Sequence, residues 1–163
     1  MNYQLSDIAR NFDLAPALAS EILKDTQMPL CKVILRNERR YPWLILVPQR
    51  YKISGGRSVA EEKSQAVEVS DLLPGDRAVM WREVDEAAAA LKAVTRCDKI
   101  NIAAFGNVTQ QLHVHILARS ASDPHWPGSA VGVDEREPYP SGSSPGWWPA
   151  FLARLALSDL TSP

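Results

Sequence analysis

Two histidines lie two positions apart in a short segment that has the pattern of a β-strand. The segment spans residues 111–117 and alternates polar with apolar residues. Because strand side chains alternate between two faces, Gln111, His113 and His115 are expected on one face. The intervening apolar residues are then expected to point into the core: Leu112, Val114 and Ile116. The pattern therefore predicts two imidazoles and a carboxamide on one surface of a sheet.

Such a pair of imidazoles is suited to nucleophilic chemistry at phosphorus. A neutral imidazole is a good nucleophile at neutral pH and a good leaving group afterwards. A second imidazole one pleat away can donate a hydrogen bond to a phosphate oxygen or to a leaving group. Carboxamides supply neutral donors to developing negative charge, and the neighbouring segments contribute Asn101 and Asn107.

The residues alone leave two other interpretations of the pair open. One is a solvated pair without a role. The other is zinc binding, because two histidines at this spacing on a strand can hold the metal. A zinc site needs further ligands, and no spacing singles out one of the candidates, which are His125, Cys31, Cys97 and the carboxylates.

Composition restricts the class of protein and its partners. The 163 residues fit one domain with a short extension, and 18 basic against 19 acidic residues give no reason to expect nucleic-acid or membrane-surface binding. Two distant cysteines without a CxxC motif favour a reducing compartment over a disulfide scaffold. No signal peptide is visible, and the longest purely apolar run outside the alanine-rich helix, 43–47, cannot span a bilayer. We expect a soluble, cytoplasmic protein without a cofactor.

Hydrophobic patterning predicts the elements that position the histidines. Strands are expected at four segments, 31–36, 43–47, 100–105 and 112–118, of which 43–47 has the continuous apolar pattern of a strand covered on both faces. A long amphipathic helix is expected over 76–95, with a buried face formed by Met80, Val84, Ala87, Leu91 and Val94. The order of these elements indicates an α+β fold with an antiparallel sheet.

The remaining segments show weaker signals. A weak helical pattern covers 16–24, and a last helix is expected near 150–157. Residues 51–75 are expected to form a loop, and their Gly55-Gly56 pair does not belong to a Walker A motif. Residues 120–149 are rich in Pro, Gly, Ser and Trp, which is typical of a surface segment anchored by aromatic side chains.

The segment QLHVHILAR at 111–119, preceded by Gly106-Asn107, resembles the signature strand of the histidine-triad (HIT) family, His-φ-His-φ-His-φ-φ with φ apolar. The run CKVILRNERRYPWLILVPQR resembles the family's hairpin before its long helix. The resemblance covers about residues 28–120, between an extension at 1–27 and a tail at 121–163. It is closest to bacterial HIT-like proteins described as diadenosine-tetraphosphate hydrolase-like.

The resemblance implies roles for individual residues. His113 aligns with the nucleophile and His115 with the histidine that contacts the phosphate. Asn107 and Asn101 fall near residues that hold phosphate oxygens. Two further positions are implied in nucleotide binding: Asn37 at the ribose hydroxyls, unless it only forms a turn, and Leu35 at the base.

One departure from the family pattern concerns the first histidine of the triad, which is Gln111 here. In the family, the backbone carbonyl at this position holds the nucleophile's other ring nitrogen, and glutamine keeps that carbonyl. The resemblance implies a homodimer that hydrolyses or transfers nucleotides at the α-phosphate, with dinucleoside polyphosphates or nucleoside phosphoramidates as substrates. Two alternatives remain: a nucleotide-binding module with little turnover, and a metal-dependent hydrolase that uses His113 and His115.

Overall fold

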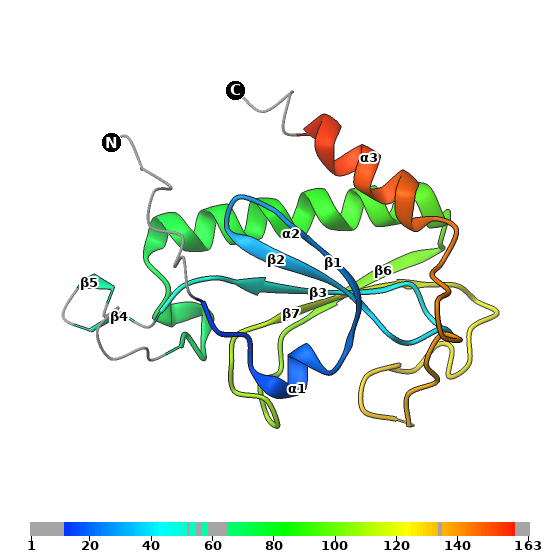
Figure 1. The fold of residues 1–163 in the computed structure, drawn as a ribbon, viewed down its shortest axis with the longest axis horizontal. Helices are drawn as coiled ribbons and strands as arrows, with labels where there is room; N and C mark the ends of the chain where they lie inside the picture. Colours follow the sequence, from blue (N-terminus) through cyan, green and yellow to red (C-terminus); the bar gives the residue numbers. More distant parts are fainter. Residues whose placement is uncertain (1–11, 52, 55–56, 59–64, 134, 159–163) are drawn as a thin grey trace.

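The chain folds into a five-stranded antiparallel sheet with the two longer helices on one side, and a short helix and irregular segments on the other (Figure 1). The computed structural model describes residues 12–51, 53–54, 57–58, 65–133 and 135–158. The strand order in the sheet is β1-β2-β3-β7-β6. The strands are β1 (Ile22–Gln27), β2 (Cys31–Arg36), β3 (Trp43–Pro48), β6 (Lys99–Ala103) and β7 (Val114–Arg119). The predicted α+β class is confirmed, and β3 is buried throughout, as expected for a central strand.

One face of the sheet is covered by the long helix α2 (Pro74–Thr95), which in turn packs against α3 (Trp148–Ser158) (Figure 1). Proline in the first turn of α2 and Asp76 beside it suit a helix start. The helix buries most of its predicted apolar face, Met80, Val84, Ala87 and Leu91, in the main core cluster; Val94 is partly buried against it. The predicted helical periodicity is therefore confirmed.

A buried carboxylate links α2 to the turn between β1 and β2. Glu83 is only 1% exposed and accepts hydrogen bonds from the backbone N–H groups of Leu30 and Cys31, each at 2.7 Å. Burial raises the pKa of Glu83, and these two donors act in the opposite direction. The carboxylate thereby satisfies two backbone donors that would otherwise be buried without a partner.

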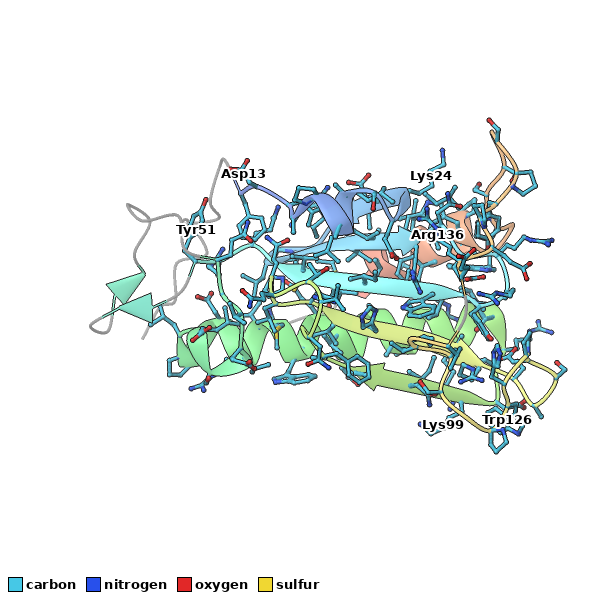
Figure 2. All side chains as sticks on the ribbon, turned by 90° about the horizontal axis from the view of Figure 1, so that it is seen from below. Asp13, Lys24, Tyr51, Lys99, Trp126 and Arg136 are labelled. Carbon is cyan, nitrogen blue, oxygen red and sulfur yellow. The ribbon has the colours of Figure 1, made fainter. Side chains whose placement is uncertain are left out.

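The opposite face carries a second, smaller apolar cluster and is covered by short segments from both ends of the chain. The cluster comprises Leu18, Ile34, Tyr41, Trp43, Ile45, Val47, Leu117 and Ala130. The short helix α1 (Pro16–Ala19) contributes Leu18, and the loop after β7 contributes Ala130. Figure 2 looks onto this face from below, with Asp13 and Trp126 over different ends of the sheet.

The structure differs from the sequence predictions at the start of the chain and after β3. The predicted helix over 16–24 ends at Ala19, because the residues from Ile22 onward pair with β2 as an edge strand with an irregular register. The expected loop at 51–75 contains the two-residue strands β4 (Ile53–Ser54) and β5 (Arg57–Ser58) and a 3-10 turn, η2 (Val69–Asp71). The Gly55-Gly56 pair lies outside the described residues. Within the described part of the chain, no helix has the length and apolar character needed to cross a membrane.

Candidate active site

His113 stands immediately before β7, and its ring is oriented by the backbone. Its Nδ1 lies 2.7 Å from the carbonyl oxygen of Gln111. Because a carbonyl oxygen only accepts, Nδ1 carries a proton, so in the neutral ring the lone pair is on Nε2. The imidazole is therefore held in the tautomer that a nucleophile at Nε2 requires.

His115 lies on the same face of the strand, with its ring centroid 4.9 Å from that of His113 and the two rings nearly perpendicular. The indole Nε1–H of Trp43 donates to its Nδ1 at 3.1 Å. Burial, with smaller contributions in the same direction from His113 and Arg36, lowers the pKa of His115 to about 3. His115 is thus a neutral imidazole at physiological pH.

The side chain of Gln111 is engaged with the N-terminal segment and not with the histidines. Its Oε1 accepts from the backbone N–H of Ala15 at 2.8 Å, and its Nε2 donates to the carbonyl of Asp13 at 3.0 Å. A carboxamide offers both a donor and an acceptor, which these two backbone groups need. Gln111 therefore orients His113 through its main chain and fixes the segment before α1 through its side chain.

A cavity of about 610 Å³ opens beside the two histidines. The turn after β6 lines it with Asn107 and Thr109, and α1 and the loop after β7 form further walls with Ala17 and Val131. A smaller cavity of about 130 Å³ shares many of these residues and extends to the buried Trp43. The volume is in the range of small-molecule sites.

Two charged residues that the sequence did not single out also line both cavities, Glu21 and Arg36. The carboxylate of Glu21 accepts from Nε and Nη2 of Arg36. The guanidinium of Arg36 lies 4.0 Å from the centroid of the Trp43 ring. A guanidinium placed over an indole is a favourable cation–π arrangement. The sequence gives one indication of this pair. Arg36 ends a predicted strand two positions after the core residue Ile34, so the two side chains lie on the same face of the strand.

Comparison with known proteins identifies the family. A family model of the HIT domain matches residues 23–122, which is more than half of the chain. The chain belongs to the histidine-triad family. Members of this family are generally nucleotide hydrolases or transferases. Among curated proteins, none matches the chain significantly.

Solved histidine-triad structures share the fold over nearly the whole chain. A histidine-triad protein from Sinorhizobium meliloti 1021 is 39% identical, with a TM-score of 0.72, and the match covers 90% of this chain and 96% of that one. A histidine-triad protein from Bradyrhizobium japonicum is 33% identical, with a TM-score of 0.72, and the match covers 90% of this chain and 96% of that one. A third, from Marinobacter aquaeolei VT8, is 28% identical, with a TM-score of 0.69, and the match covers 93% of this chain and 98% of that one. The similarity therefore extends beyond the matched domain into both terminal segments.

The two asparagines expected near the phosphate occupy different places in this histidine-triad fold. Asn107 lines the larger cavity together with both histidines. Asn101 on β6 pairs with Leu117 on β7. The pair Ala103 and His115 lies two positions further along the same two strands. Asn101 is on the histidine face but is not among the described residues that line the cavity.

The structure does not bring Asn37 and Leu35 to the histidines. Asn37 follows β2, and its Oδ1 accepts from the backbone N–H of Tyr139 at 2.8 Å, so it tethers the C-terminal tail. Leu35 is buried in the main core cluster beneath α2, on the face opposite the histidines. Strand alternation explains this placement, because its neighbours Ile34 and Arg36 face the cavity side instead.

The ligands considered for a zinc site are dispersed. His125 contacts the Tyr41 hydroxyl through Nδ1 at 2.9 Å, and Cys31 and Cys97 are buried free thiols. In the residues that the structure describes, no group of three or more His, Cys, Asp or Glu side chains comes together that could hold a metal ion.

Proposed function

We propose that this protein cleaves nucleotides at the α-phosphate through a nucleotidyl-histidine on His113. The observation that carries the proposal is the hydrogen bond from His113 Nδ1 to the Gln111 carbonyl, which leaves the Nε2 lone pair available beside a ligand-sized cavity. In the first step, Nε2 forms a bond to phosphorus while the bond from phosphorus to the leaving group breaks. In the second, water attacks phosphorus and the P–N bond breaks, which releases the nucleoside monophosphate and restores His113.

The neighbouring groups supply positioning and charge stabilisation in both steps. A neutral His115 can donate to a phosphate oxygen or to the departing group, and Asn107 offers a neutral amide donor from the cavity wall. Phosphoryl transfer depends mainly on such positioning. Dinucleoside polyphosphates, as in diadenosine-tetraphosphate hydrolase-like proteins, and nucleoside phosphoramidates are the substrate classes that we propose.

A panel of these nucleotides, assayed with purified protein before and after chelation, tests the proposal. We expect turnover of at least one phosphoanhydride or phosphoramidate, unaffected by a chelator. Activity that is lost on chelation and restored by zinc would instead favour the metal-dependent hydrolase. Calorimetric binding of a nucleotide without any turnover would favour the binding module.

We also propose that the protein acts as a homodimer. β6 is an edge strand of the sheet, and Ile102 on it and Trp81 on α2 are 45% and 46% exposed. A second copy of the chain would cover such apolar surface. Met80, Val84 and Leu91, apolar helix residues that the sequence offers for the core or the interface, lie in the core. Sedimentation at micromolar concentration is expected to show a dimer, and a species of only 18.0 kDa would contradict it. A cytoplasmic location stays a prediction.

A further inference from the structure

Trp43 donates a hydrogen bond to the second histidine of the site. An indole N–H can only donate, and the Nε1–H of Trp43 points to Nδ1 of His115 at 3.1 Å. We propose that Trp43 is a positioning residue that fixes His115 as the Nε2–H tautomer, so that Nε2–H is the donor presented to the substrate. The nitrogen that remains available in the cavity lined by His115 is then Nε2.

The two histidines thereby hold opposite tautomers. His113 donates from Nδ1 to the Gln111 carbonyl at 2.7 Å and offers a lone pair at Nε2. His115 accepts at Nδ1 from Trp43 and offers a proton at Nε2. One ring is consequently prepared to attack phosphorus and the other to donate to an oxygen. In the reverse tautomer, His115 would present a lone pair that repels a phosphate oxygen.

The orientation of the indole is itself secured by the charged pair in the cavity wall. Arg36 lies over the Trp43 ring at 4.0 Å, and both Nε and Nη2 of Arg36 donate to Glu21. The Trp43 ring also packs edge-on against Tyr41, with centroids 6.3 Å apart. The indole is 2% exposed, so it has little freedom to turn its N–H away from His115.

The charge of His115 does not change near neutral pH, so only its tautomer can vary. The titratable and charged groups that act on His115 are His113 and Arg36, and both lower its pKa together with burial. The ring therefore stays neutral at physiological pH, and the tautomer is the property left for Trp43 to set. This makes the proposal independent of any protonation step near neutral pH.

The tautomer can be read directly by nuclear magnetic resonance of the whole protein. The chain has three histidines, so two-bond proton–nitrogen correlations of nitrogen-15-labelled histidine give three sets of signals, and His125→Ala and His113→Ala identify two of them and leave the third to His115. At neutral pH we expect the wild-type His115 to show the Nε2–H pattern. An Nδ1–H pattern or a charged ring in the wild-type protein would overturn the proposal without requiring any variant.

Trp43→Phe keeps an aromatic ring but removes the N–H. We expect the His115 signals to move toward a mixture of the two tautomers. Trp148→Phe is the matched control, because Trp148 is also a buried tryptophan, 6% exposed, that stacks on Phe151 in α3. It should leave the His115 pattern unchanged. An unaltered tautomer in folded Trp43→Phe would overturn the proposal.

The kinetic consequence rests on the proposed function. In Trp43→Phe, kcat should fall by about tenfold with little change in KM, less than the loss expected when a donor is removed outright. A rise in KM with unchanged kcat would contradict a positioning role. If no nucleotide is turned over by the wild-type protein, the tautomer measurement still decides the inference, and the failure belongs to the proposed function.

Discussion

The two faces of the sheet are built in different ways although they share the same strands. Beneath α2, regular secondary structure buries a continuous apolar cluster, with Glu83 as a fully hydrogen-bonded exception. On the histidine face, short segments from both ends of the chain surround a cavity with imidazole, indole and charged groups. The contrast indicates that one face supplies most of the packing energy, whereas the other carries the proposed active site. Substitutions on the two faces should therefore affect different measurements.

The largest effect on activity is expected from His113→Ala. If His113 is the nucleophile, its loss should raise the activation free energy by about 4 kcal/mol or more while nucleotide binding persists. The free energy of unfolding should change much less, because the truncation enlarges an existing cavity. Steady-state kinetics and denaturant titration measure the two quantities.

His115→Ala should cost less activity than His113→Ala, and the double variant should be little worse than His113→Ala alone. Turnover by His113→Ala at a tenth of the wild-type rate or better, a difference of about 1.4 kcal/mol, would contradict the nucleophile assignment.

Leu91→Ala should show the opposite behaviour. Leu91 is fully buried under the sheet, so its truncation should lower the free energy of unfolding by about 2–5 kcal/mol. At a temperature where the variant remains folded, kcat should stay within about twofold of wild type. A strong loss of kcat with little loss of stability would show that the two faces are not separable.

The stability of the protein should depend on the protonation of His115. Its folded pKa of about 3 lies below the ordinary value of 6.5, so between these values the unfolded chain binds more protons. The stability that neutral His115 contributes is complete above pH 6.5 and is lost as the pH falls toward 3. From about pH 7.5 to about pH 5, wild type should therefore lose about 2 kcal/mol more than His115→Gln. Equal losses in denaturant titrations would contradict the burial of a neutral imidazole.

Gln111→Ala should have a moderate effect. The variant keeps the carbonyl that orients His113, so kcat should remain within about twofold of wild type. It loses two hydrogen bonds to the segment before α1, which should cost about 1–2 kcal/mol of stability and raise KM by loosening a cavity wall. A large fall in kcat with unchanged KM would show that the carboxamide acts in the chemistry.

Asn37→Ala should have the smallest effect. It removes one hydrogen bond to the Tyr139 backbone, which should lower stability by about 1 kcal/mol. Since Asn37 is not among the described cavity residues, KM should change by less than about twofold. A large rise in KM would instead support the ribose-binding role that the family resemblance implies.

The sequence predicted the elements whose residues repeat with a regular period. The helix expected over 76–95, which spans Pro74–Thr95 in the structure, and the strand at 31–36 followed from the residue pattern. So did the burial of the apolar residues that alternate with the histidines, Leu112, Val114 and Ile116. The strand Ile22–Gln27 was missed because its polar and apolar residues do not alternate, and pairing with β2 decides its conformation.

The cavity walls could not be predicted because they depend on contacts between distant segments. Gln111 and Ala15, which are hydrogen-bonded, lie 96 positions apart in the sequence. Likewise, Arg36 and Glu21 meet only because β1 and β2 are paired, and no local pattern marks Trp43 as a donor to His115. The motif located the histidines and the carbonyl of Gln111 that orients His113, whereas the partner of His115, Trp43, is 72 positions away in the sequence.

The most direct test of the central claim is rapid quenching of a turnover reaction with substrate labelled at the α-phosphate. A nucleotide on His113 would be joined through a phosphoramidate bond, so the protein-bound label should be stable to base, labile to acid and absent in His113→Ala. Digestion and mass spectrometry should place it on the peptide that contains His113. Active enzyme that forms no labelled adduct at any reaction time would contradict the covalent mechanism and favour direct attack by water.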